Sequence, residues 1–466
     1  MRIRLSYLAS LSPTLITLAC TSPLIAPAHA GDYTAVSKQI VDEVTGHNQP
    51  YNNLVLLDAI GARVSGSPQA DLAVQWAKQK MESYGFNKIT LDPCTVPKWS
   101  RGNSEKASVT LSNGNTQALT VAALGGSIGT PNGGVEASVV EVHSLEDVIK
   151  LGRSGIKGKI VFFNQALDPS LDSFKAYSSV VSLRTNGAST AAKFGAVATV
   201  LRSLSTLPDD DHPHTGVLSY SVLAGKIPSA ALSTHAANIL SGLLKENSSL
   251  KLKLELSASG ITETKSFNVI GEITGSELPN EVFILGGHLD SWDLGRGDQD
   301  DGAGVAQSLE VLRSIKALGL KPKRTIRVVL FMSEEFGGIG AGQYERKLLR
   351  SGEKIVGAME SDRGGFSPRG FSVHANSSAY KTIESFKPYL ALAHSDRITS
   401  ASYCGTDTET LGSAGVPEME LIPDPTHYFD YHHSALDQLS AVNSNDLAMG
   451  AAGMTVLSYL IAQEGL

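Results

Sequence analysis

The strongest constraint on the fold is a series of apolar segments after Ser266 that alternate with helical patterns. Short runs rich in Val, Ile and Leu fit buried strands at 268–273, 282–285, 326–332 and 355–359. Helical patterns lie between them, the clearest from 302 to about 318. Strands that are apolar throughout, with helices between them, predict an α/β sheet covered on both faces. The carboxyl ends of such strands are where ligands gather.

The remaining sequence predicts a second domain. A chain of 466 residues exceeds what one compact core usually organises. Between Ser100 and Gly260, strand-like runs are separated by Gly-rich turns and by helical runs. We therefore expect residues 31–99 and 261–466 to form the principal domain, and residues 100–260 to form an inserted mixed α/β domain.

The first thirty residues have the pattern of an export signal. A start with two arginines is followed by an apolar stretch from 8 to 24 and by small residues at 28–30. Ser, Thr and Pro interrupt that stretch too often for the roughly 20 apolar residues that cross a bilayer. We expect a secreted or periplasmic protein that starts near Gly31 and has no stable membrane span. A lipid anchor at Cys20 is the alternative.

Composition limits both the partners and the source of stability. Lys and Arg number 39 against 46 Asp and Glu, for a net charge of −7, and no basic run appears, so nucleic acid is an unexpected partner. Only Cys94 and Cys404 follow the expected cleavage point. One possible pair cannot be the framework of a chain this long, and the sequence does not decide whether the two cysteines pair.

Histidines and carboxylates follow the predicted strands. They are His288 and Asp290 after the second strand, Asp300 and Asp301 after the next loop, Glu334 and Glu335 after the third strand, Asp362 after the fourth and, much later, His432 and His433. A lone His-x-Asp motif is usually a polar turn. Adjacent carboxylates against one cleft, however, are costly without a compensating cation or proton. Imidazole and carboxylate suit a borderline-soft divalent metal, so the group predicts a metal site.

Two aspartates of this group have other expected tasks. Asp290, two positions after His288, is placed to hold the other ring nitrogen of that histidine. Asp301 is placed to cap the following helix.

These motifs together resemble the two-zinc exopeptidase family that includes aminopeptidase Y and glutamate carboxypeptidase II. The resemblance covers nearly all of the chain after the signal. Segments similar to the carboxypeptidase Q subgroup are 286–293, 359–362 and Pro213-His214-Thr215-Gly216. The resemblance implies an α/β, phosphorylase/hydrolase-like exopeptidase fold with a central mixed sheet. Within 100–260, three segments resemble the protease-associated domain of secreted peptidases.

The resemblance also implies a role for each site residue. Asp300 would bridge two zinc ions, the first completed by His288 and Asp362 and the second by Glu335 and His433. Glu334 would be the general base, taking a proton from the attacking water and returning it to the leaving amine.

One choice within this ligand set stays open. His432 competes with His433, which the spacing to Asp437 favours. Gln438 departs from the family, which often has Thr there, and this weakens the detail around the ligands more than their identity.

The implied activity is hydrolysis of dipeptides or short peptides, and a homodimer is a candidate assembly. A glutaminyl cyclase-like enzyme and a catalytically silent binding protein are the alternatives. Cyclases resemble a one-metal variant and silent proteins have lost ligands, so the complete five-ligand set favours hydrolysis. The recognised terminus stays open: candidate groups for an ammonium are Asp407, Glu409 and Asp424, and for a carboxylate Arg363 and Arg397.

Two further sets of residues are candidates for a metal cluster and for the lining of the substrate pocket. His212 and His214 lie beside three aspartates, but Pro213 and the polar run favour a solvated loop over a metal cluster. His394 and the segment 404–407 are candidates to line the substrate pocket.

Overall fold

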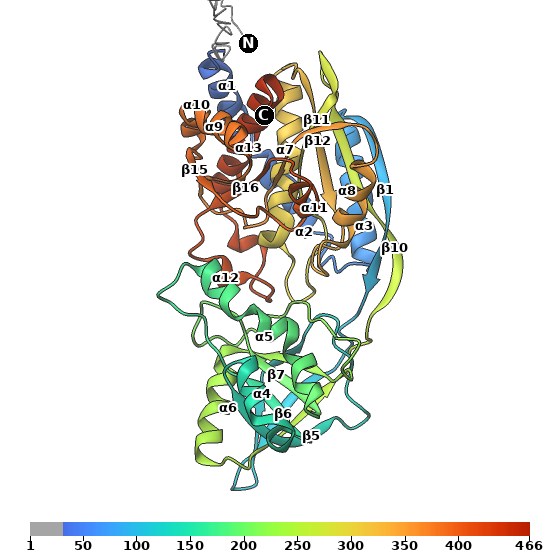
Figure 1. Ribbon diagram of the computed structural model, residues 1–466, viewed down its shortest axis with the longest axis vertical. Coiled ribbons are helices and arrows are strands. Elements are labelled where there is room, and N and C mark those ends of the chain that lie inside the picture. The colour runs from blue at the N-terminus through green and yellow to red at the C-terminus, as the bar shows by residue number, and fades with distance from the viewer. Residues whose placement is uncertain (1–30) are drawn as a thin grey trace, which may run out of the picture. The chain divides into compact units, whose positions relative to one another are not determined.

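Two eight-stranded sheets organise residues 31–466, the part of the chain that the computed structural model describes (Figure 1). The predicted export signal and Cys20 lie outside the described residues. Among residues 31–466, no helix combines the length and the apolar composition of a membrane span.

The first sheet is the mixed sheet that the sequence predicts. Its order is β1 (Asn87–Lys98), β10 (Thr262–Ile273), β12 (Arg324–Phe331), β11 (Leu278–His288), β13 (Lys354–Glu360), β16 (Glu418–Pro423), β14 (Pro368–His374) and β15 (Arg397–Ser400). β12, β11, β13 and β16 run parallel. β1 and β10 pair antiparallel with their neighbours, and β14 pairs antiparallel with β16 but parallel with β15. The predicted α/β class with a central mixed sheet is therefore confirmed.

Helices cover both faces of this sheet, because successive strand residues point to opposite sides. In β11, Phe283 and Leu285 pack on one face and Val282 and Ile284 on the other. The first face carries α1 (Thr34–Gly46), α3 (Pro68–Ser83), α7 (Ala303–Ala317) and α13 (Ser444–Glu464). The second carries α8 (Ile339–Leu348) and α11 (Glu409–Ser413). Helix α2 (Gln49–Asp58) lies against α7, and α9 (Ser377–Ser385) and α10 (Lys387–Leu390) precede β15.

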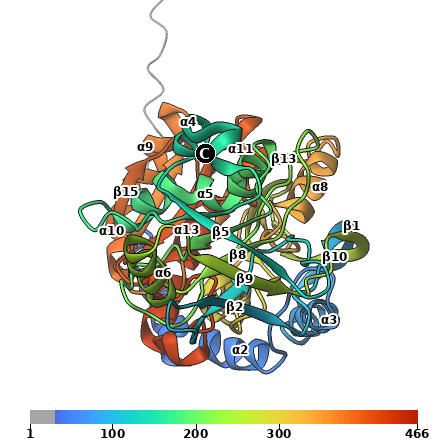
Figure 2. The ribbon, with the colours of Figure 1, turned by 90° about the horizontal axis from the view of Figure 1, so that it is seen from below.

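The second sheet is built from residues within 100–260. Its order is β3 (Thr116–Leu119), β2 (Glu105–Thr110), β9 (Lys251–Leu256), β5 (Val135–Val142), β6 (Ile160–Phe163), β7 (Ala198–Arg202), β8 (Ser229–Leu232) and β4 (Val121–Ala123). Helix α6 (Thr234–Glu246) packs on one face, and α4 (Leu145–Ile156) and α5 (Ser173–Lys193) on the other (Figure 2). We call residues 100–260 the inserted segment. Its status as a separate domain stays a prediction.

The inserted segment leaves and rejoins the first sheet at one place. β1 and β10 pair antiparallel up to Lys98 and Thr262, so the segment emerges at the end of a two-stranded ribbon. Close packing ties it to the loop after β11. The buried indole of Trp292 lies in that loop and contacts Trp99 edge to face, with ring centroids 6.2 Å apart. Gly125 of the inserted segment lies against the same indole.

This contact generates a stability prediction. A Cβ at Gly125 would lie 1.8 Å from Cη2 of Trp292, so Gly125→Ala forces the indole or the backbone to move. We expect a loss of about 1–3 kcal/mol of unfolding free energy, the usual cost of overpacking. Gly242→Ala in α6 is the matched control, because its Cβ would meet nothing within 4 Å. Equal denaturation midpoints of the two variants in the same buffer would contradict the prediction.

Candidate metal centre

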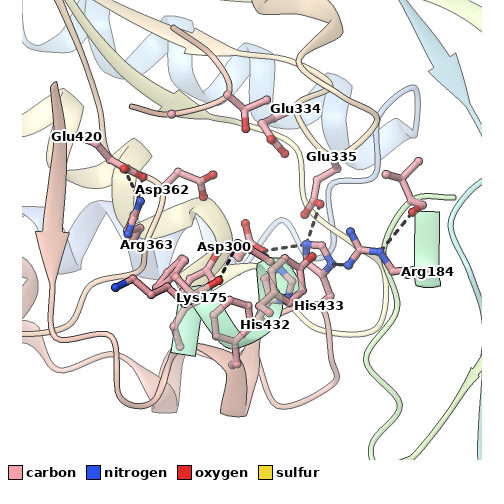
Figure 3. A pocket seen from close by; sticks show the side chains of 18 of the residues that line it. Lys175, Arg184, Asp300, Glu334, Glu335, Asp362, Arg363, Glu420, His432 and His433 are labelled. Carbon is pink, nitrogen blue, oxygen red and sulfur yellow. Dashed lines mark hydrogen bonds and ion pairs between the residues drawn. The ribbon is translucent and has the colours of Figure 1, made fainter. Parts of the chain in front are cut away.

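The carboxyl ends of three parallel strands bring the predicted residues together. His288 ends β11, which lies between β12 and β13. Glu334 and Glu335 follow β12, and Asp362 follows β13. Figure 3 shows Asp300, Glu335, Asp362 and His433 around one space, with Glu334 across from the histidines.

Asp300 lies at the centre of the group, with an imidazole beside each of its oxygens. Oδ1 is 3.1 Å from Nε2 of His288, which is also 3.4 Å from Oδ1 of Asp362. Oδ2 is 3.1 Å from Nε2 of His433, which is also 3.0 Å from Oε2 of Glu335. Nε2 of each imidazole thus faces Asp300 and one further carboxylate.

The group carries more buried negative charge than its histidines offset. Buried carboxylates at or next to it are Asp290, Asp300, Asp301, Glu335, Glu360 and Asp407. Burial raises the pKa of Glu334 to about 8, with His288 opposing the rise and neighbouring carboxylates adding to it. Burial likewise raises the pKa of Glu335 to about 7. Oε1 of Glu335 has no hydrogen-bond partner among the described residues.

Bound divalent cations fit these features. Among the described residues, three overlapping sets of side chains could each hold an ion: His288 with Asp300 and Glu335, His288 with Asp301 and Asp362, and Asp300 with His432 and His433. Imidazole nitrogen and carboxylate oxygen are the donors that zinc accepts. Positive charge at this place would also offset the repulsion among the carboxylates.

Asp290 differs in part from its predicted task. Nδ1 of His288 lies 3.0 Å from the main-chain carbonyl of Asp290, whereas the carboxylate is 3.8 Å away. That carboxylate instead accepts hydrogen bonds from the backbone N–H groups of Ser333 (2.6 Å) and Glu334 (3.1 Å). Asp290 therefore meets the second ring nitrogen of His288, as predicted, but mainly through its carbonyl oxygen, because its carboxylate binds the turn after β12.

Two aspartates shape the loop that carries Asp300. Asp301 accepts hydrogen bonds from the N–H of Gly304, at the start of α7, and from the N–H of His288, so the expected cap is present. Asp437 accepts from the N–H groups of three successive residues, 298, 299 and 300. In the sequence, Asp437 helped only in the choice between His432 and His433. Its spacing from His433 along the chain is the one sequence feature that points to its part in holding the loop at 298–300.

His432 and His433 stack on each other, with ring centroids 3.5 Å apart. Nε2 of His432 is 3.8 Å from Asp300, farther than the 3.1 Å of His433. Only His433 of the two also forms an ion pair with Glu335 in the described chain. The geometry thus favours His433, as the spacing did.

The second histidine of the inserted segment's acidic loop is not solvated. His212 forms a partly exposed ion pair with Asp210 near the surface. His214 is 2 % exposed, and its Nδ1 lies 2.7 Å from the carbonyl oxygen of His432. The solvated-loop prediction is wrong for His214 because its loop folds under the histidine pair.

Cys94 and Cys404 are both buried and unpaired.

A cavity of about 950 Å³ opens beside the carboxylates. Tyr403, Gly405 and Thr406 line it, so the pocket prediction for 404–407 holds in part, whereas His394 is exposed elsewhere. Arg363 also lines it and is held by Glu420 at 2.6 Å. The other candidates for the substrate termini, Asp407, Glu409, Asp424 and Arg397, are absent from the described lining.

Helix α5 of the inserted segment forms another wall of the cavity. Its lining residues include Phe174, Lys175 and Tyr177. The ring of Phe174 stacks on Tyr428 of α12 (Tyr428–Tyr431), and the ring of Tyr177 stacks on Phe429. The same cavity is therefore walled by both parts of the chain.

Known proteins share both the sequence and this architecture. Residues 268–459 match peptidase family M28. Carboxypeptidase Q of Homo sapiens is 37 % identical over 441 residues, which span 93 % of this chain and 90 % of that protein. The chain belongs to peptidase family M28. This M28 peptidase is accordingly a metallopeptidase of the exopeptidase class.

Solved structures agree with the fold. The peptidase M28 precursor of Shewanella amazonensis is 34 % identical, with a TM-score of 0.87 over 92 % of this chain and 96 % of that one. A zinc aminopeptidase from Bacillus subtilis has a TM-score of 0.64 at 18 % identity, over 88 % of this chain and 94 % of that one. The second likeness shows a shared fold alone.

Proposed function

We propose that this M28 peptidase is an exported two-zinc exopeptidase that hydrolyses dipeptides or short peptides. The observation that carries the proposal is the position of Asp300, whose two oxygens face different imidazoles, each with a second carboxylate beside it. A single carboxylate placed in this way is suited to bridging two ions.

The proposed ligands divide into two sets around that bridge. His288 and Asp362 complete the first, and Glu335 and His433 complete the second. Zinc ions bound there would lower the pKa of a water between them and polarise the scissile carbonyl. Catalytic zinc sites keep a position open for water or substrate, and the adjoining cavity gives access for both.

Glu334 is the proposed general base. It lines the cavity without belonging to either ligand set. The carboxylate of Asp290 holds its backbone N–H and thereby fixes the turn that presents it. Glu334 takes a proton from the attacking water and returns it to the nitrogen of the leaving amine. Asp290 is a positioning residue in this scheme, both for the base and, through its carbonyl, for His288.

The inserted segment is proposed as a domain that limits substrate size. Its helix α5 walls the cavity opposite the strand ends, which favours short peptides over folded chains. The relatives named carboxypeptidase Q support action at a chain end. Export to the periplasm or the medium and formation of a homodimer stay predictions.

The first prediction of this scheme concerns metal content. The purified protein should hold close to two zinc ions per chain. Asp300→Asn should weaken the binding of both ions, because it alters the bridge, whereas His433→Ala should weaken one. Asp424→Asn, at an exposed ion pair with Arg369, is the control. Elemental analysis that finds no zinc, together with activity unaffected by a chelator, would exclude the proposal.

The second prediction separates the two adjacent glutamates. Glu334→Gln should keep both ions and lose about 10²–10⁴-fold in kcat, since it removes only the base. Glu335→Gln should also lower the zinc content. Glu345→Gln, at a buried glutamate that accepts from the N–H of Thr410, controls for loss of a buried carboxylate. Near-normal turnover by Glu334→Gln would show that the base lies elsewhere.

The third prediction concerns substrate size. The full-length enzyme should cleave a dipeptide much faster than it cleaves casein, because the inserted segment walls the cavity. Dipeptides with either terminus blocked will also show which end is recognised. Comparable rates on casein, with cleavage at internal bonds, would be incompatible with an exopeptidase.

A further inference from the structure

The two histidines next to Asp300 are each oriented by a main-chain carbonyl, but from different parts of the chain. Nδ1 of His288 lies 3.0 Å from the carbonyl oxygen of Asp290, two residues away. Nδ1 of His433 lies 3.3 Å from the carbonyl oxygen of Thr215, in the inserted segment. Metal-binding histidines usually donate their second ring N–H to such an acceptor, which fixes the tautomer and the ring plane. Thr215 thus occupies the place at His433 that Asp290 occupies at His288.

The neighbours of this carbonyl also bind the main chain of the histidine pair. Nδ1 of His214 lies 2.7 Å from the carbonyl oxygen of His432, so this nitrogen carries the proton and donates it. The N–H of Thr215 donates to the carbonyl oxygen of His433 at 2.9 Å. Two residues of the inserted segment therefore hold both the backbone and the ring of the loop at 432–433. All four residues are largely shielded from water, which strengthens these bonds.

The next residue shows how closely the two loops approach. Gly216 has a φ of 130°, and a Cβ added there would lie 2.7 Å from Nδ1 of His433 and 2.4 Å from Nη1 of Arg184. No side chain fits between the inserted segment and the ring at this point. Nη1 of Arg184 lies 3.5 Å from the carbonyl oxygen of Thr215 and also 3.5 Å from Nδ1 of His433 (Figure 3 shows Arg184 beside His433).

Hydrogen bonds also hold His214, Thr215 and Gly216 to the second sheet and the segments next to it. The N–H of His214 donates to Oγ of Ser203, directly after β7. Oγ1 of Thr215 donates to the carbonyl oxygen of Ala123 in β4. The carbonyl oxygen of Gly216 accepts from the N–H of Gly125. The contact with His433 is therefore made by a part of the inserted segment that its own sheet holds in place.

We infer that His214 and Thr215 are positioning residues of the metal centre, through which the inserted segment orients the ligand His433. The inference rests on the proposed assignment of His433 as a zinc ligand. It gives the motif Pro213-His214-Thr215-Gly216 a task, and it makes the inserted segment part of the centre as well as a wall of the cavity. The second ion, at Glu335 and His433, depends on this contact, whereas the first does not.

The test compares three substitutions of His214 in the full-length protein. Asn can present an N–H at the position of Nδ1, Gln places its amide one bond farther out, and Leu has no donor. His214→Leu and His214→Gln should bind one of the two zinc ions about 10–100-fold more weakly, as expected for loss of a group that orients a ligand. His214→Asn should restore most of that affinity. Zinc affinity is measured by competition with a chelator, independently of turnover.

Ser205→Ala is the matched control. Oγ of Ser205 is buried at the same contact and donates to the carbonyl oxygen of Phe429, three residues before His432. Its loss should leave both zinc affinities unchanged. An equal loss in Ser205→Ala would assign the effect to general loosening of the contact and overturn the inference, as would wild-type affinities in His214→Leu.

A second variant covers the case in which His214→Leu does not fold. Gly216→Ala should displace the ring of His433 and weaken the same single ion, because its Cβ competes with Nδ1 for space. Two tightly bound ions in folded Gly216→Ala would overturn the inference. Failure of the proposed function looks different: the wild-type protein itself would then bind fewer than two zinc ions.

Discussion

The repulsion among buried carboxylates around Asp300 is the constraint on which the rest of the structure depends. Several acidic side chains meet where parallel strands end, and they outnumber the imidazoles and the arginines Arg63, Arg184 and Arg363 that lie beside them in the described chain. A cluster of this kind is costly in a low-dielectric interior unless cations compensate it. Metal bound at this place would therefore contribute to stability as well as to catalysis.

The acidic residues nevertheless have two separate tasks, set by what their oxygens accept. Asp437, Asp301 and Asp290 accept backbone N–H groups and hold three loops in shape. Asp300 and Glu335 keep oxygens directed at imidazole nitrogens. Residues of one chemical type thus shape the site and supply its proposed ligands, and the hydrogen bonds of each carboxylate distinguish the two roles better than its burial does.

The four strands β10, β11, β12 and β13 and the acidic or histidine residues after three of them are predictable because both depend on local patterns, whereas β14, β15 and β16 were not predicted. A strand is recognisable from its apolar run, and His288, Glu334 and Asp362 follow directly from where three such runs end. The positions of Asp290 and His214 were not predictable in the same way. Whether a carboxylate meets a ring or a neighbouring turn, and whether an acidic loop lies in solvent or beneath another loop, depends on contacts between segments distant in the chain.

Main-chain carbonyls, rather than carboxylates, lie beside the second ring nitrogen of both histidines. The same excess of negative charge accounts for this difference. A carboxylate at the position of the Thr215 carbonyl would fix the tautomer of His433 equally well, but it would add another buried anion beside Asp300 and Glu335. A carbonyl accepts the ring N–H without adding net charge. It can be supplied only where backbone approaches the ring closely, and Gly216 makes that approach possible. The contact between the inserted segment and the loop at 432–433 thus supplies an acceptor for His433 without adding a further negative charge to an acidic centre.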